Sequence, residues 1–285
     1  MKIFVAAAVA AVLAHAAFAD IPAGIAALEK GDAELAAATF AQSFEAGDAD
    51  GAFYLGRMFE MGLGAAPDMI QATSLYQASA DNGSVLAQNR LGLMYLDGQG
   101  VLKDYVKGAE LVCKAADQGD ANAQFNCGAV YAEGRGVEAD KTKAIGYWDA
   151  ASVQDHIAAT NLLAMSYKNA DGVEADAGKM FELFNKTAKV GNALGLYEVA
   201  LAYQSGTGTD ADAVKAYTFA NIASAMQHPD APALRDTIEK TLTTAQVTEG
   251  QTAARDWMAA TQAEIDAQNA LKTADAEPNA TTAKN

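Results

Sequence analysis

The stretch Leu91 to Val101 reads LGLMYLDGQGV, and it returns in altered form along the chain at a fixed spacing of 36 residues. Stepping by 36 residues from its last glycine meets a glycine every time, at Gly64, Gly100, Gly136, Gly172 and Gly208. Glycine makes up only 24 of the 285 residues, so five matches in five positions are not a coincidence. The chain therefore contains five tandem repeats with no insertion between them.

Other positions of the stretch recur with the same period. A second glycine lies two residues earlier, at Gly62, Gly98, Gly134 and Gly206, with Ala170 in the fourth repeat. An aromatic residue precedes the glycines in each repeat, at Phe59, Tyr95, Tyr131, Tyr167 and Tyr203. An aspartate follows them in each repeat, at Asp68, Asp104, Asp140, Asp176 and Asp212. This pattern is typical of a solenoid built from one supersecondary unit per repeat.

Each repeat predicts a helix, a glycine turn and a second helix. In the second repeat we expect the first helix over about Ala87–Asp97, because its apolar residues recur at helical spacing. Gly98 and Gly100 would end this helix, since glycine accepts the left-handed conformation found after helix C-termini. Asp104 would cap a second helix over Tyr105–Asp117. The G-x-G sequence is therefore a helix-capping loop, whereas a phosphate-binding loop would follow a strand and occur once.

The predicted fold is all-α: an α/α solenoid, or superhelix, of five 36-residue helix-turn-helix repeats with capping helices at both ends. We expect the five repeats at residues 51–230. Residues 20–50 would form the N-terminal capping helices, because Asp32, Phe40 and Gly47 match the second half of a repeat.

The C-terminal capping helices are expected at residues 231–268. One would lie near Ala233–Ala245 and the other near Glu249–Gln268, with Trp257 as the residue that anchors it. Residues 269–285 have no apolar periodicity, so we expect a disordered tail there.

The first 19 residues have the pattern of a secretory signal peptide. Lys2 is basic, Ile3–Leu13 is an apolar run, and Ala17–Ala19 forms an A-x-A cleavage signal. A membrane anchor is the alternative, but spanning a bilayer takes about 20 apolar residues. We therefore expect an exported protein that begins at Asp20 and is not inserted in the membrane. It would be periplasmic in a Gram-negative bacterium and otherwise secreted.

The charge of the chain limits the classes of partner. Its formal net charge is −16 at pH 7, which repels the phosphate backbone of nucleic acids. We therefore expect no nucleic-acid partner.

The repeat pattern resembles that of the Sel1-like repeat family, a relative of the tetratricopeptide repeats. The resemblance extends from Gly51 to about Gln227. In the second repeat it is carried by Ala87, Leu91, Gly92, Tyr95, Gly98, Gly100, Val101, Asp104, Ala115, Ala116 and Gly119. In the third repeat it is carried by Ala123, Gly128, Tyr131, Gly134, Gly136, Val137, Asp140, Ala144 and Ala151.

This resemblance implies a solenoid that acts as an adaptor between proteins. Exported bacterial members of the family include regulators that hold a sensor kinase inactive. Cysteine-rich secreted members include proteins that bind or slowly hydrolyse β-lactams, and those relatives usually carry a cysteine pair in every repeat. This chain has two cysteines in total, so it departs from their pattern.

The two cysteines, Cys113 and Cys127, lie seven residues on either side of residue 120, where a turn between antiparallel helices is expected. Their side chains can then face each other, and an oxidising compartment favours a disulfide between them. The alternative is two separate buried thiols that act as small apolar side chains.

The family resemblance also indicates where a partner would bind, because in tetratricopeptide repeats the first helix of each repeat lines the concave groove. Aromatic side chains on this helix would supply contact area, and asparagines would bind a peptide backbone. The alternative is that these side chains pack between repeats as core. The predicted partner-binding residues are Phe53, Arg57, Asn89, Leu93, Phe125, Asn161 and Tyr197.

The sequence contains no recognisable set of catalytic residues. His156 and His228 lie about two repeats apart and lack the i, i+4 partner of a helical zinc site. The serines form no G-x-S-x-G motif. We therefore predict no catalytic residue, no metal site and no cofactor.

Together these features predict an exported, non-enzymatic monomer that binds a protein or peptide through its concave face, as a periplasmic regulator of a signalling receptor would. Two alternatives stay open. One is a β-lactam-binding or weakly hydrolytic protein, and the other is a peptidoglycan-associated adaptor of the cell envelope.

Overall fold

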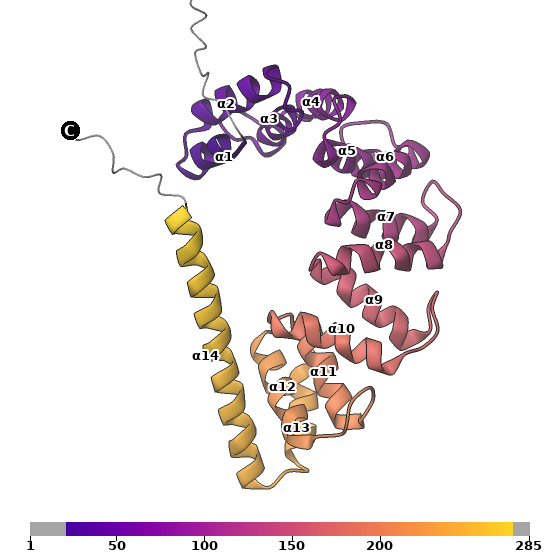
Figure 1. Ribbon diagram of the computed structural model, residues 1–285, viewed down its shortest axis with the longest axis vertical. Helices are drawn as coiled ribbons and strands as arrows, with labels where there is room; N and C mark the ends of the chain where they lie inside the picture. The colour runs from indigo at the N-terminus through magenta and orange to yellow at the C-terminus, as the bar shows by residue number, and fades with distance from the viewer. Residues whose placement is uncertain (1–20, 276–285) are drawn as a thin grey trace, which may run out of the picture. The chain divides into compact units, whose positions relative to one another are not determined.

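The computed structural model describes residues 21–275, and all regular secondary structure in that range is helical. The helices follow one another through short loops (Figure 1). They are α1 (Ile21–Glu29), α2 (Ala33–Glu45), α3 (Asp50–Met61), α4 (Met69–Asp81), α5 (Val85–Asp97), α6 (Tyr105–Asp117), α7 (Ala121–Glu133), α8 (Lys141–Val153), α9 (Ile157–Asn169), α10 (Ala177–Lys189), α11 (Ala193–Ser205), α12 (Ala213–Ala225), α13 (Ala231–Glu239) and α14 (Thr244–Asp275).

The predicted all-α repeat solenoid is confirmed. We call the first helix of each repeat the A helix (α3, α5, α7, α9 and α11) and the second the B helix (α4, α6, α8, α10 and α12). In the second repeat the B helix has the predicted bounds, Tyr105–Asp117. The A helix begins at Val85, two residues before the predicted start, because the Ser84 side chain caps it by accepting the backbone N–H of Ala87.

The repeated aspartates and glycines form the helix caps that the sequence predicts. The Asp104 carboxylate accepts the backbone N–H of Lys107 and so caps α6. The aspartates at the equivalent positions cap the other B helices in the same way. Gly98 ends α5 with φ 74°, in the left-handed region where glycine carries no steric cost.

The second glycine of each loop, typified by Gly100, has a further reason to lack a side chain. Each of these glycines packs against the beginning of the preceding B helix or its equivalent. A Cβ built on Gly64 would lie 2.8 Å from the Cβ of Ala33, and one on Gly100 would lie 2.8 Å from the Thr73 hydroxyl oxygen. The glycine therefore sets how closely one repeat can approach the next, in addition to forming the turn.

By its internal contacts the chain divides into two compact units, which are described separately. The N-terminal unit holds the residues up to Ala123 together with Arg135–Val137, and the C-terminal unit holds Gln124–Gly134 together with the residues from Glu138 onwards. In the N-terminal unit, Tyr76, Leu91 and Met94 are fully buried in one apolar cluster between helices.

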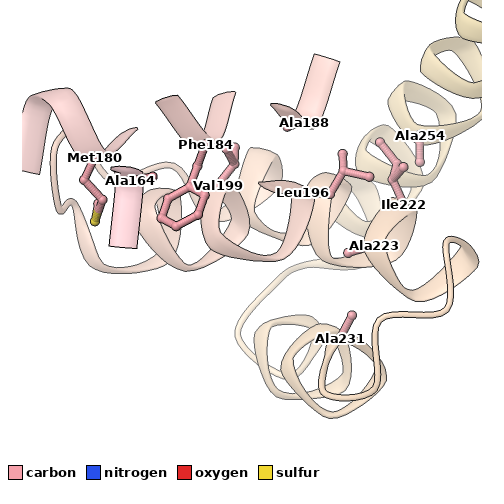
Figure 2. Close-up of a cluster of buried hydrophobic side chains, with 10 residues drawn as sticks. All are labelled: Ala164, Met180, Phe184, Ala188, Leu196, Val199, Ile222, Ala223, Ala231 and Ala254. Carbon is pink, nitrogen blue, oxygen red and sulfur yellow. The ribbon is translucent and has the colours of Figure 1, made fainter. Parts of the chain in front are cut away.

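The C-terminal unit has its largest described core cluster around α9 to α14. Figure 2 shows Phe184 of α10 beside Val199 of α11, and Ile222 of α12 near Ala254 of α14. Trp257 of α14 packs against this cluster, which confirms its predicted role as an anchor. α14 therefore covers part of the core that the last repeat would otherwise expose.

At the N-terminal end, α1 and α2 precede the first repeat. Asp32 caps α2 by accepting the backbone N–H of Leu35, and Phe40 is fully buried. Gly47 follows α2 with φ 99°. These residues therefore occupy the structural positions of the B-helix residues that they match in sequence. The predicted signal peptide, residues 1–19, lies outside the described residues.

The predictions for the C-terminal helices were wrong in their bounds. The first helix, expected near Ala233–Ala245, is α13 and ends at Glu239, and the second begins at Thr244 instead of Glu249. The cause is a capping box: Thr243 accepts the backbone N–H of Gln246 through its hydroxyl, while the Gln246 side chain accepts the backbone N–H of Thr243.

The predicted disordered tail at residues 269–285 also needs correction, because α14 continues through Asp275. The segment contains alanine, leucine and lysine, which favour helix, and adding residues to an existing helix avoids the cost of nucleation. Residues 276–285 lie outside the described part of the chain.

Candidate protein-binding face on the A helices

All seven predicted partner-binding residues are partly buried in the structure, so each side chain both packs and keeps some exposed surface. The N-terminal unit holds four of them, on α3 and α5, and the C-terminal unit holds the other three, on α7, α9 and α11. We call the surface formed by these positions within each unit the A-face. Its residues are Phe53, Arg57, Asn89, Leu93, Phe125, Asn161 and Tyr197.

The aromatic residues of the A-face use part of their surface within the repeat. Phe125 stacks on His156 with ring centroids 4.8 Å apart, and Tyr197 stacks on His228 at 4.1 Å. Phe53 contacts Tyr54 edge-on at 5.2 Å. Part of the surface of each ring is therefore used in packing, as the packing alternative expects, and part of it stays exposed.

The histidines also have a structural task that the sequence did not reveal. The Nδ1 atom of His156 accepts the backbone N–H of Ala159 and caps α9, as Asn192 caps α11 through its side-chain oxygen. His228 accepts the backbone N–H of Asp230. The available signal was that His156, Asn192 and His228 follow one another at intervals of 36 residues, because side chains at this position all precede an A helix or its equivalent.

The amide of Asn161 is used inside the C-terminal unit. Its Nδ2 donates to Asn192 Oδ1 at 3.0 Å, and its Oδ1 accepts the Thr187 hydroxyl at 2.9 Å. These bonds hold the amide in one orientation. Asn161 is therefore a fixed polar group on this face, and one further amide hydrogen and one oxygen lone pair remain for a partner.

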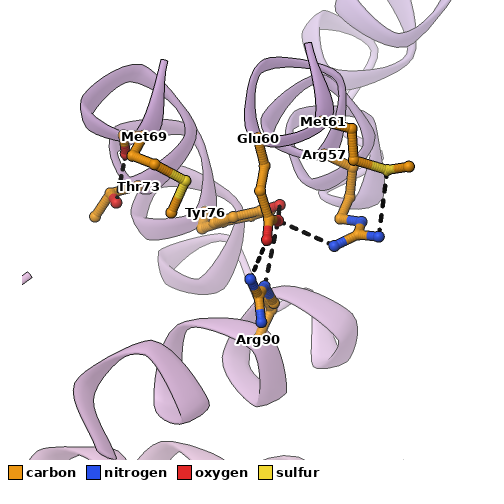
Figure 3. Close-up of polar contacts among 7 residues, drawn as sticks. All are labelled: Arg57, Glu60, Met61, Met69, Thr73, Tyr76 and Arg90. Carbon is orange, nitrogen blue, oxygen red and sulfur yellow. Dashed lines mark hydrogen bonds and ion pairs between the residues drawn. The ribbon is translucent and has the colours of Figure 1, made fainter. Parts of the chain in front are cut away.

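Arg57 of the A-face belongs to a cluster of polar contacts around Glu60, near the end of α3 (Figure 3). Arg57 donates to the Glu60 carboxylate at 3.0 Å and also contacts the Met61 sulfur at 3.4 Å. Arg90, from the next A helix, donates to both carboxylate oxygens. The Tyr76 hydroxyl of α4 donates to the same group. One carboxylate therefore joins three consecutive helices.

The contacts determine the charge of this cluster. Burial alone raises the pKa of Glu60, but the hydrogen bonds from Tyr76 and Arg90 and the charges of Arg90 and Arg57 outweigh it, so the pKa is lowered. Burial and the neighbouring Glu60 carboxylate raise the pKa of Tyr76, so the phenol stays protonated. Two guanidinium groups around one carboxylate leave a local net charge of +1.

The C-terminal unit repeats this arrangement with the charges exchanged. Lys168 and Glu198 lie 108 residues, or three repeats, after Glu60 and Arg90. The Lys168 ammonium donates to both oxygens of Glu198, at 2.8 and 2.7 Å. The glutamate side chain is only 8% exposed. The same position between neighbouring A helices thus holds an ion pair in both units. The later A helix supplies the cation in the N-terminal unit (Arg90), and the earlier A helix supplies it in the C-terminal unit (Lys168).

Four lysines at one repeated position of the B helices make contacts that the sequence analysis did not predict. In the second to fifth repeats, a lysine three residues after the capping aspartate places its ammonium over the tyrosine that recurs on the A helix, 4.3 to 5.2 Å from the ring centroid. The first repeat has Gln71 and Phe59 at these positions. The 36-residue spacing of Lys107, Lys143, Lys179 and Lys215 was the signal for these cation–π contacts.

The two cysteines of the chain, Cys113 and Cys127, are disulfide-bonded. The predicted disulfide is therefore confirmed, and the alternative of two separate thiols is wrong.

Between residues 21 and 275, no group of three or more histidine, cysteine, aspartate or glutamate side chains is placed to hold a metal ion. No helix in the described part of the chain is both long enough and apolar enough to span a membrane.

Comparison with known families matches the Sel1 repeat five times, over residues 49–84, 85–120, 121–156, 157–192 and 193–228. These matches begin two residues before the predicted repeat boundaries and cover the A and B helices in turn. Among curated proteins, no significant match is found.

Solved structures show the same fold. A protective antigen of uropathogenic Escherichia coli strains, which displays an SLR fold, superposes with a TM-score of 0.71 and 26% identity over 88% of this chain. The match covers 54% of that antigen, so this chain spans about half its length. A Sel1 repeat protein from Oxalobacter formigenes superposes with a TM-score of 0.69 and 25% identity, over 83% of this chain and 99% of that one.

Proposed function

Because this chain belongs to the Sel1 repeat family, whose repeats generally form scaffolds for protein–protein interaction, we propose that it is a non-enzymatic scaffold that binds a protein or peptide through the A-face. In solenoids the curvature of the stacked repeats turns one side into an extended concave binding surface. The A helices would supply that surface here.

The observation that carries this proposal is the state of the seven A-face side chains. All are partly buried, and several are held in place by contacts within the repeat, such as Tyr197 by His228 and Asn161 by Asn192. A side chain that is already ordered loses little conformational freedom when a partner binds. Fixed aromatic and polar groups of this kind suit recognition of another protein.

We further propose that the protein is exported and acts in the periplasm as a regulator of a signalling receptor. The support for export is the signal-peptide pattern of the first 19 residues, together with the disulfide, which oxidising compartments favour. The regulatory role rests on what exported relatives of the family do. Mass spectrometry of protein purified from its own cells should give a chain that begins at Asp20, whereas an intact Met1 would overturn the export proposal.

The binding proposal is tested by a crosslinking pull-down from the cell envelope. The structure argues against alanine variants of Phe53, Phe125 and Tyr197, because their rings also pack within the repeats. We would instead use Arg57→Gln combined with Leu93→Ser, which changes two A-face residues of the N-terminal unit. The matched control is Ile70→Ser with Leu102→Ser, two residues that are 82% and 90% exposed elsewhere on this unit.

We expect the A-face variant to lose the captured protein and the control variant to keep it, with both folded by circular dichroism. Capture that survives the A-face variant, or that is lost only in the control, would overturn the binding-face assignment. Binding of the wild-type protein to purified sacculi, or turnover of a chromogenic β-lactam, would instead support one of the two alternatives from the sequence.

A further inference from the structure

We infer that a pocket in the N-terminal unit receives an apolar side chain that is flanked by a basic residue in a partner segment. This inference deepens the proposed function and rests on it, since it describes how the scaffold would recognise a protein. The pocket has a volume of about 350 Å³ and lies between α2, α3 and the loop after α3. Its principal lining residues are Ala33, Glu34, Leu55, Met58, Phe59 and Leu63.

The pocket exists because a small residue occupies one position of the repeat. Ala33 is the first residue of α2, and the loop glycine Gly64 packs against it. The equivalent residue of α4 is Met69, whose side chain packs into the apolar cluster and whose Cε lies 3.4 Å from a Cβ built on Gly100. A long side chain at this position fills the space beneath the loop, whereas alanine leaves it open.

The C-terminal unit supports this explanation independently. Ala177 begins α10 and lies 144 residues, or four repeats, after Ala33. A pocket of about 220 Å³ lies against Ala177 as well, lined by Met180, Leu201 and Ala202 among others. The three intervening B helices begin with Met69, Tyr105 and Lys141, which are much larger than alanine. Ala213 also begins a B helix, but no loop glycine of a further repeat packs against it. At Ala33 and Ala177, which such a glycine contacts, alanine coincides with a pocket in each unit.

The lining of the N-terminal pocket selects an apolar group. Its walls are the side chains of alanine, leucine, methionine and phenylalanine, and Met58 at its base is buried. A pocket of this size takes one large aliphatic or aromatic side chain, such as leucine or phenylalanine. Leu63 at the loop is 36% exposed, so a partner would cover apolar surface that is now in water.

The charge around the pocket selects the flanking residue. Glu34 is the one charged residue of the lining, and its side chain is exposed. From Ile21 to Asp68 the sequence has eight acidic and two basic residues, and with Arg90, which pairs with Glu60, the balance is −5. A lysine or arginine next to the apolar anchor would therefore be attracted to this region, and an acidic neighbour would be repelled.

The test is a methyl NMR titration of the full mature chain with blocked seven-residue peptides at millimolar concentration. The probe peptide is Gly-Ser-Lys-Leu-Lys-Ser-Gly, and two controls replace the central Leu by Ser or both Lys by Glu. We expect the probe to shift the methyl signals of Leu55, Met58 and Leu63. The serine peptide should bind about tenfold more weakly or not at all, because it lacks the buried leucine.

Two variants test the pocket itself. Ala33→Met copies the residue that the next repeat carries, so it should fold, fill the pocket and abolish the shifts. Glu34→Lys changes an exposed residue and should weaken the preference for the lysine peptide over the glutamate peptide, because the region becomes less negative. Unchanged shifts in Ala33→Met, equal binding of the leucine and serine peptides, or an unaltered charge preference in Glu34→Lys would overturn the inference.

The pull-down described above separates this inference from the proposed function. If Ala33→Met captures the partner as well as the wild type does, while the A-face variant loses it, the pocket inference fails and the scaffold proposal stands. If the A-face variant also keeps the partner, the proposed binding face fails independently of the peptide titration.

Discussion

Gly136 packs directly on the backbone carbonyl group of Tyr105, at the first turn of α6, and a Cβ added to this glycine would overlap the carbonyl oxygen. Gly136 also has φ 79°, where a side chain is strained. Two physical requirements thus explain why this position of the repeat is glycine. The backbone makes a left-handed turn there, and it closely approaches the preceding B helix.

Substitution Gly136→Ala should therefore destabilise the protein by more than the cost of the dihedral angle alone. We expect a loss of about 3 kcal/mol in the free energy of unfolding, from left-handed strain and the overlap with Tyr105. Urea denaturation at 25 °C measures it. Gly119→Ala is the control, because Gly119 has φ 96° but open space around it, and should lose only about 1–2 kcal/mol. Equal losses in the two variants would contradict the close-approach argument.

The fourth repeat offers the reverse experiment. Ala170 ends α9 with φ 55°, at the position that is glycine in the other four repeats. Ala170→Gly should raise the free energy of unfolding by about 0.5–1 kcal/mol, because relief of left-handed strain exceeds the added entropy of the unfolded chain. Thermal unfolding is the readout. Ala38→Gly, in the exposed middle of α2, should instead lower stability by up to about 1 kcal/mol.

The Glu60 carboxylate should make stability depend on pH in the acidic range. Its pKa is lowered in the folded state from an ordinary 4.5, so its contribution is present above pH 4.5 and is lost as the pH falls through the folded-state pKa. Glu60→Gln should cost about 2 kcal/mol at pH 7, because Arg90 and Tyr76 lose a charged partner.

Urea unfolding of the wild type and Glu60→Gln at pH 7, 5 and 3 checks this prediction. The difference between the two proteins should be the same at pH 7 and 5 and smaller at pH 3. Glu110→Gln, on an exposed position of α6, controls for the loss of one negative charge from an acidic protein. A difference that grows on acidification would contradict the assigned direction of the pKa shift.

The disulfide should contribute to stability mainly by restricting the unfolded chain. Cys113 and Cys127 are 14 residues apart, and a loop of this length is stabilised by up to about 3 kcal/mol in the chain-entropy treatment. Adding a reductant should lower the melting temperature of the wild type and leave that of Cys113→Ala with Cys127→Ala unchanged. If the melting temperature of the wild type stays the same after complete reduction, verified by thiol titration, the disulfide does not contribute to stability in this way.

Much of the fold could be predicted because its determinants are local. Asp104 caps a helix and Gly98 ends one through bonds to backbone groups within a few residues, so their spacing in the sequence gives helix bounds directly. The helix α14 was placed less well, since its start depends on the reciprocal bonds of Thr243 and Gln246, which the repeat period does not include.

The candidate site was predictable only in part. The positions of Phe53 and Tyr197 on A helices follow from the period, but the partners of their rings do not, because Tyr54 and His228 reach them through packing. The position of Glu60 on an A helix also follows from the period. Its bond to Arg90, 30 residues later, does not, because it depends on how two A helices pack against each other.

The sequence by itself determined the all-α solenoid and the five repeats, because a strict period imposes the same local caps and the same apolar faces on every unit. Only the tertiary structure decided which polar groups meet between repeats and where the packing stays incomplete. Alanine at the start of α2 has nothing in the sequence that marks it as the wall of a pocket. The pocket beside Ala33 appears only when the neighbouring loop folds over it, because a void is a property of the surfaces that enclose it.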